Sequence, residues 1–162
     1  LEKSILTILS RLEPKKIVIV SSAPQIRFPD CYGIDMSKMN EFIAFRALIA
    51  LIKENNMEAK LDEVHQQCKV AVEELENKNY VNQLYELFSA EEISEKIGEI
   101  VKPVILDSEL EIIYQTVDSL HKAIPNHSGD WYFTGNFPTR GGNRVVNKAF
   151  VNYMEGKLVR AY

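Results

Sequence analysis

The sequence predicts a helix-rich α/β fold, and one stretch near the start carries most of that prediction. Residues 17–20 are Ile, Val, Ile and Val, a continuous β-branched apolar run. Such a run is typical of a parallel strand that is buried on both faces. A polar turn, Ser21–Pro24, follows directly, and helical patterns flank the strand on both sides. In open α/β sheets ligands bind beyond the carboxyl ends of the strands, so this turn is the first place to expect a site.

Length and composition are those of an ordinary globular protein. The chain has 162 residues, enough for one domain with its own core, and 46% of them are hydrophobic. The formal net charge of −4 argues against a protein held to nucleic acid mainly through phosphate contacts. No apolar run approaches the ~20 residues of a membrane span, and the first residues are not a signal peptide. We therefore expect a cytoplasmic protein without nucleic-acid or membrane partners.

The first predicted element is a helix from Leu1 to about Leu12, with Ile5, Leu6 and Leu9 on one side. No Met and no N-cap residue precede Leu1, so we expect a fragment that begins inside an element of a longer protein. A lone parallel strand needs neighbours for its backbone groups. Upstream strands or a second chain are expected to supply them, and this favours a homo-oligomer.

Helical patterns dominate the middle of the chain. Ser37 is predicted to cap a long helix that ends near Asn56, and a second helix is expected over residues 60–76. His65 lies beside the apolar stripe of that second helix and is expected at the surface. The patterns Ser89-x-x-Glu92 and Ser108-x-x-Glu111 both have the form of a capping box and predict two further short helices.

The last segment is different in character. Residues 130–139 are aromatic and β-prone, with Gly135 and Asn136 as a turn. A final helix with Val146 and Phe150 on its apolar side is expected to end at Gly156.

Cysteine and histidine residues give no metal site. Cys31 and Cys68 are the only cysteines, lie far apart in the chain, and fit two buried thiols in a reducing compartment. The histidines, His65, His121 and His127, lack the spacing of zinc ligands.

Two stretches resemble the amidophosphoribosyltransferases, which catalyse the first committed step of purine synthesis. The run SSAPQIRFPDCYGIDM resembles the segment that follows the phosphoribosyl-pyrophosphate loop in that family. The residues that fit its pattern are Ser22, Ala23, Pro24, Ile26, Arg27, Phe28, Pro29, Tyr32, Gly33, Ile34 and Asp35. The run WYFTGNFPT resembles a turn in the family's C-terminal part, through Phe133, Gly135, Phe137, Pro138 and Thr139. The stretches occur in the family's order, and the helical block between them does not match clearly.

The resemblance implies a fragment of a type I phosphoribosyltransferase fold with a largely helical C-terminal part. Residues 1–52 would be the end of the core, made of a helix, a strand, the hood loop and a helix. Residues 53–124 would be a helical insertion or cover. Residues 125–162 would form an aromatic turn and a C-terminal helix that packs back on the core.

Five residues are candidates for ligand binding. Ser21 and Ser22 could bind a phosphate or a sugar at the strand end, or form an ordinary exit turn. Arg27 suits bidentate contact with phosphate or carboxylate, or else an ion pair with Asp30 or Asp35. Residues 30–35 resemble the hood loop, which lines the pocket in phosphoribosyltransferases, and Tyr32 could stack on a ring there. Asp35 either contacts ligand or caps the following helix.

The catalytic parts of the family are not found in these 162 residues. The family's nucleophile is an N-terminal cysteine, whereas this chain begins with Leu1, and the acidic loop that holds magnesium and phosphoribosyl pyrophosphate is absent. One branch of the family carries an iron–sulfur cluster. Cys31 fits one ligand position, but residues 126–131 contain no cysteine, and a cluster needs about four thiolates, so none is expected.

We therefore expect the C-terminal fragment of an amidophosphoribosyltransferase, inactive when isolated and without a catalytic residue of its own. Magnesium would bind through upstream residues, and phosphoribosyl pyrophosphate and purine nucleotides would be partners of the parent enzyme. The alternative is a non-catalytic nucleotide-binding or interaction module with the same fold. A purine-salvage phosphoribosyltransferase is less well supported, since its own phosphate loop would also have to be present.

Overall fold

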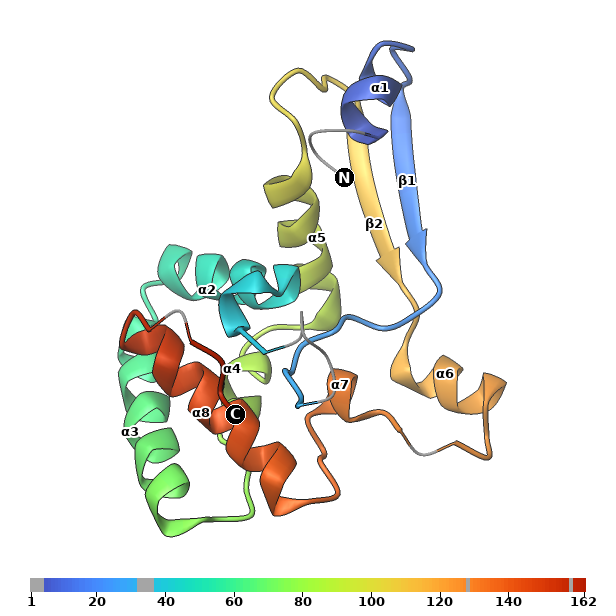
Figure 1. Ribbon diagram of the computed structural model, residues 1–162. Helices are drawn as coiled ribbons and strands as arrows, with labels where there is room; N and C mark the ends of the chain where they lie inside the picture. The colour runs from blue at the N-terminus through green and yellow to red at the C-terminus, as the bar shows by residue number, and fades with distance from the viewer. Residues whose placement is uncertain (1–4, 32–36, 128, 158) are drawn as a thin grey trace.

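The computed structural model describes residues 5–31, 37–127, 129–157 and 159–162. In the order of the chain (Figure 1), its elements are α1 (Thr7–Ser10), β1 (Lys16–Ser21), the 3-10 turn η2 (Met39–Glu41), α2 (Ile43–Glu54), α3 (Glu58–Glu74), α4 (Asn82–Tyr85), α5 (Ala90–Val101), β2 (Glu109–Tyr114), α6 (Val117–Ala123), α7 (Trp131–Thr134) and α8 (Arg140–Met154). This is the helix-rich α/β class that the sequence predicts. Among these residues no helix is long and apolar enough to cross a membrane.

The sheet consists of β1 and β2, which run parallel with Ile17 opposite Leu110 and Ser21 opposite Tyr114. The predicted strand is present, but its expected burial on both faces is wrong. Ile17 is only 8% exposed, whereas Val18 is 47% and Val20 71% exposed. The reason is that α1 and α5 pack on one face of the pair, while the described residues supply nothing to cover the other.

The second strand corrects the prediction of a helix after Ser108. Glu111 does not close a capping box; its carboxylate pairs with Lys16 of β1 at 2.7 Å. The Ser108 hydroxyl donates to the carbonyl of Pro14. Residues 109–114 also fit a period of two, because Leu110 and Ile112 alternate with more polar or exposed neighbours. Pairing with β1 gives the backbone N–H and C=O groups on one edge of this segment their hydrogen bonds, and it therefore selects the strand over the helix.

The capping box at the start of α5 is confirmed. The Ser89 hydroxyl accepts from the Glu92 N–H at 3.1 Å, and the Glu92 carboxylate accepts from the Ser89 N–H at 2.7 Å. The helix predicted over 60–76 is α3, and the final helix is α8, with Gly156 just beyond its end at φ 68°.

Two other local predictions are wrong. Ser37 does not cap α2, because η2 intervenes and the extended residue Phe42 precedes the first turn of that helix. The aromatic run at 131–134 is a single helical turn rather than β structure. Gly135 ends it at φ 73°, a left-handed conformation that favours glycine. Of the predicted first helix, residues 1–4 lie outside the described residues; residues 5 and 6 form a π turn that leads into α1, which ends at Ser10, and Leu12 is 75% exposed.

The main core joins α2, α3, α5 and α8 (Figure 1). At its centre the ring of Phe45 meets Phe150 edge-on, with centroids 6.2 Å apart, and both side chains are 0% exposed. Asn147 of α8 is also 0% exposed and links that helix to the loop after α3. This core holds α5 in place, and α5 in turn forms one wall of the cleft described below.

The exposure of three side chains can be compared with the predictions: one agrees and two differ. Cys68 is buried, as expected, but Cys31 is exposed, because it sits on the surface of the loop after β1. The His65 side chain is only 14% exposed rather than at the surface, and its Nε2 lies 4.0 Å from a carboxylate oxygen of Glu155. It is covered because α3 packs against α8 there.

Candidate functional site

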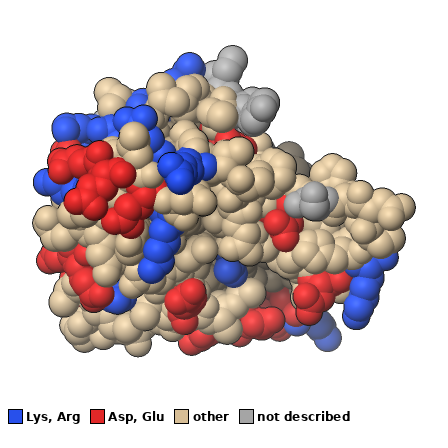
Figure 2. Space-filling model, turned by 90° about the horizontal axis from the view of Figure 1, so that it is seen from below, with Lys and Arg blue, Asp and Glu red and all other residues tan. Residues whose placement is uncertain are grey.

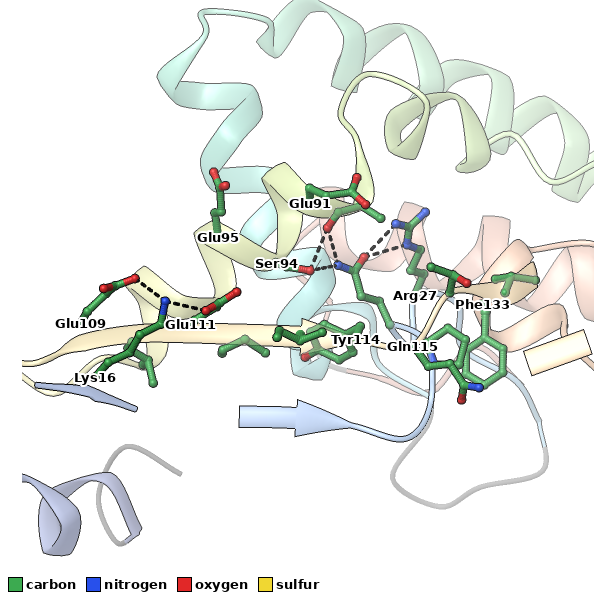
Figure 3. A pocket seen from close by; sticks show the side chains of 18 residues that line it. Lys16, Arg27, Glu91, Ser94, Glu95, Glu109, Glu111, Tyr114, Gln115 and Phe133 are labelled. Carbon is green, nitrogen blue, oxygen red and sulfur yellow. Dashed lines mark hydrogen bonds and ion pairs between the residues drawn. The ribbon is translucent and has the colours of Figure 1, made fainter. Parts of the chain in front are cut away.

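A cleft of about 710 Å³ lies between β2 and α5 and extends past the carboxyl end of β2 (Figure 3). Its floor is the whole length of β2 and the residues that follow the strand, and the first turns of α5 form a wall. Arg27, from the loop after β1, lies at the end beyond the strands (Figure 3), and Gln25 of the same loop also lines the cleft. This is the position at which open α/β sheets bind ligands.

Arg27 is held in the cleft by neutral partners. Its Nε and Nη2 donate to the side-chain oxygen of Gln25 at 3.1 and 2.8 Å. The guanidinium carbon lies 5.1 Å from the ring centroid of Tyr85, and the Tyr85 hydroxyl donates to the Arg27 carbonyl at 3.1 Å. Gln25 is itself fixed, because its amide nitrogen donates to the Ala90 carbonyl and to the Ser94 hydroxyl, both at 2.8 Å.

The charge of Arg27 is not balanced by a carboxylate in contact with it, within the part of the chain that the structure describes. Burial lowers the pKa of its guanidinium, and the nearby Glu91 carboxylate partly opposes that shift; arginine is so strongly basic that the group stays charged at physiological pH. The ion pair considered with Asp30 does not form: that carboxylate accepts from the Cys31 N–H at 2.6 Å and from the Trp131 indole at 3.0 Å. Since Gln25 occupies only part of the guanidinium's five donors, the remaining ones are available to an anion.

The rest of the cleft is acidic and aromatic. Glu91 and Glu95 stand exposed on α5, and neither forms an ion pair with another described residue. At the far end Lys16 bridges the two glutamates of β2, Glu109 at 2.8 Å and Glu111 at 2.7 Å (Figure 3). The two ends therefore differ: the Arg27 end suits a phosphate or carboxylate, and the α5 wall suits a positive group.

Tyr114 and Phe133 supply the apolar surface beside Arg27. Burial raises the pKa of the Tyr114 hydroxyl, so this side chain is neutral at physiological pH. Aromatic faces next to a cation are suited to an anionic ligand with a planar or sugar-like body.

Of the residues predicted to bind ligand, Arg27 lies in the cleft and the two serines do not line it. The Ser21 hydroxyl donates to the Ala23 carbonyl at 2.9 Å and accepts from the Ala23 N–H at 3.3 Å, which is the geometry of an exit turn. Ser22 is exposed. Tyr32 and Asp35 lie outside the described residues, so a ligand role for either stays a prediction.

Sequence reasoning missed Gln25, Ser94, Tyr114 and Phe133. Ser94 lies on a helix that was predicted, but nothing in its neighbourhood indicates that it faces Gln25, 69 positions earlier. Tyr114 was missed because its strand was interpreted as a helix. No local pattern distinguishes these residues from ordinary core or surface residues.

No group of three His, Cys, Asp or Glu side chains in the described ranges is arranged to hold a metal ion. The family resemblance places the magnesium site of the parent enzyme in residues upstream of this chain, so magnesium binding stays a prediction. The absence of an iron–sulfur cluster stays a prediction. On the face shown in Figure 2, basic side chains lie among acidic ones and form no continuous basic surface.

Comparison with known proteins gives one short similarity. A stretch of 31 residues is 58% identical to the amidophosphoribosyltransferase of Pasteurella multocida (strain Pm70). The match covers 19% of this chain and 6% of that protein, so it is a partial similarity to a transferase. No protein-family model matches the chain, and no solved structure does.

Proposed function

We propose that this chain is the C-terminal part of the phosphoribosyltransferase portion of an amidophosphoribosyltransferase. The observation that carries the proposal is the 58% identity over 31 residues to the Pasteurella enzyme. The fold is compatible with it, since a parallel strand pair ends at a cleft that contains an arginine without a carboxylate partner among the described residues. Because the match covers 6% of that enzyme, the activity and substrates of the whole protein are part of the proposal.

In the complete reaction, ammonia derived from glutamine attacks C1 of phosphoribosyl pyrophosphate. A C–N bond forms, the bond from C1 to the pyrophosphate oxygen breaks, and pyrophosphate leaves with the bonding electrons. The new ammonium group loses a proton to give phosphoribosylamine. The described residues of this chain would contribute binding rather than chemistry: Arg27 holds a phosphate group, and Tyr114 and Phe133 exclude water from one side of the ligand.

The open edge of β1 fits the same proposal. The edge of β1 away from β2 has no partner strand among the described residues, and Val18 and Val20 are exposed on a face that a larger α/β sheet would cover with a further layer. We propose that the strands carrying the phosphoribosyl-pyrophosphate loop pair with this edge. On its own the chain is then inactive, because that loop is absent from the 162 residues.

The proposal is tested by segment exchange. The 31 matched residues of the Pasteurella enzyme are replaced by those of this chain, and pyrophosphate release is measured with phosphoribosyl pyrophosphate, ammonia and magnesium. We expect the chimaera to keep its activity. The control carries the same 31 residues in shuffled order and should be inactive. If the chimaera is folded but as inactive as the control, the segment does not have the proposed role.

A second candidate is a non-catalytic nucleotide-binding module, and the observation that favours it is that the Arg27 guanidinium contacts only neutral groups among the described residues. Calorimetry of the purified chain with adenosine and guanosine monophosphates separates the two. Binding that Arg27→Ala abolishes, while the exposed control Arg144→Ala leaves it intact, supports an autonomous nucleotide site. Absence of binding supports a purely structural contribution to a larger enzyme.

A further inference from the structure

The backbone of β2 has an edge that is not used by β1. The Glu109 N–H donates to the Lys15 carbonyl at 3.3 Å, and the Gln115 N–H donates to the Ser21 carbonyl at 3.2 Å. In a parallel ladder alternate residues face the same neighbour, so the odd-numbered residues of β2 bond to β1. The N–H and C=O groups of Ile112 and Tyr114 therefore point away from β1, toward the open edge of the sheet.

Helix α5 covers this edge at one end and leaves it open at the other. A Cβ placed on Gly98 would lie 3.6 Å from the Leu110 carbonyl oxygen, so the helix backbone comes close to the strand there. Further along, the cleft separates the two elements, and the residues from 109 to 117 all line it. The edge groups of Ile112 and Tyr114 lie in this stretch, and within the described residues they have no hydrogen-bond partner.

We propose that this cleft is a strand-pairing site, in which an extended peptide segment with basic side chains adds to the open edge of β2 at Ile112 and Tyr114. Main-chain hydrogen bonds to an exposed edge are a common mode of peptide recognition. The cleft runs along the whole of β2, with the first turns of α5 as its wall, so a segment paired with this edge would lie between β2 and α5 (Figure 3).

Charge complementarity identifies the kind of peptide. Glu91 and Glu95 line the cleft from α5; neither forms an ion pair with a described residue, although Glu91 lies near enough to Arg27 to act on its charge. Glu109 and Glu111 share a single cation, Lys16. A Lys or Arg side chain of the peptide would find carboxylates on the wall beside it, whereas an acidic peptide would be repelled along most of the cleft. This site does not depend on Arg27 and goes beyond the proposed function.

The test uses two fluorescein-labelled pools of hexapeptides with blocked ends. In one pool Lys alternates with Val, Ile or Phe; in the other Glu replaces Lys. Fluorescence anisotropy with the purified chain should show saturable binding of the Lys pool, and binding of the Glu pool should be weaker by about tenfold or more. Failure of the Lys pool to bind at concentrations up to about 1 mM, or equal binding of the two pools, overturns the proposal.

Two variants test the mode of binding. Tyr114→Pro removes an N–H that β1 does not use and puts a ring on the open edge, so it should weaken binding of the Lys pool by about tenfold. Tyr114→Phe keeps the N–H and should stay within about twofold of the parent chain. If Tyr114→Pro does not fold, the double variant Glu91→Lys and Glu95→Lys takes its place and should reverse the preference between the pools. Unchanged binding in a folded Tyr114→Pro variant contradicts strand pairing. Unchanged binding in the charge-reversed variant contradicts the assigned charge of the peptide.

Discussion

Asn147 is predicted to be one of the most sensitive polar positions for stability. Its side-chain oxygen accepts from the Tyr80 N–H at 3.1 Å and from the Cys68 thiol at 3.4 Å. Its amide nitrogen donates to the Lys78 carbonyl at 2.8 Å. The side chain is 0% exposed, so the hydrogen bonds by which it joins α8 to the loop after α3 are shielded from water.

The substitution Asn147→Ala removes the hydrogen-bond partner of two backbone groups at once. A hydrogen bond whose partners are rehydrated costs about 1 kcal/mol when lost, and a group that stays buried without a partner costs about 1–3 kcal/mol. For the Tyr80 N–H and the Lys78 carbonyl together, the expected loss in the free energy of unfolding is therefore about 2–6 kcal/mol. This is a large part of the ~5–15 kcal/mol that holds a typical domain folded.

Urea unfolding followed by circular dichroism measures the effect, provided that the dependence of the free energy on urea is unchanged. Asn147→Leu separates the polar term from the packing term, because leucine has a similar size and leaves little cavity. Both variants should be destabilised. The control Lys148→Ala, on the same helix and without an ion pair to any described residue, should stay within about 0.5 kcal/mol of the parent chain.

The reasoning is refuted if Asn147→Leu is as stable as the parent chain. That result would mean that the backbone groups of the 78–80 loop find water or other partners at no cost. Destabilisation by Ala but not by Leu would show that Asn147 matters through its volume alone.

The remaining predictions concern the turn at 135, the helix cap and the two thiols. Gly135→Ala should lower the melting temperature markedly, because φ is 73° and the added Cβ would lie 2.3 Å from the Asn82 side-chain oxygen; a melting temperature equal to that of the parent chain contradicts this geometry. Ser89→Ala should cost about 1 kcal/mol of unfolding free energy in the same urea assay, because it removes the cap of α5, and an unchanged value would mean that the cap is not needed. Burial raises the pKa of the Cys68 thiol to about 12, and a hydrogen bond with Asp30 raises that of Cys31. With a disulfide reagent at pH 8 the native chain should therefore show one reactive thiol, Cys31. Its reaction should become faster as the pH rises, because the thiolate is the nucleophile. Rapid reaction of both thiols would be inconsistent with the buried position of Cys68.

The cleft could not be predicted from any single stretch of the chain, because its lining residues come from segments far apart in the sequence. Arg27 was proposed as an anion ligand from its neighbours in sequence, and the structure does place it in a cleft. Its actual partners, Gln25 and Tyr85, were not foreseen, and the ion pair with Asp30 does not form. Whether Arg27 binds an anion stays a prediction that the calorimetry addresses.

The sequence by itself determined the features that depend on residues a few positions apart. The cap at Ser89, the apolar stripes of α3 and α8, and the strand nature of Ile17–Val20 follow from contacts and conformational preferences within one or two turns of chain. These could be predicted because the interacting groups are fixed by their spacing.

Only the tertiary structure decided the identity of β2 and the position of the cleft. Residues 109–114 satisfy a helical period and a strand period equally well, and pairing with β1, some ninety positions earlier, selects the strand. The same pairing leaves one edge of β2 and one face of the sheet uncovered within the described residues. Backbone groups need partners, and which distant segment provides them is set by how the whole chain packs, not by any local pattern.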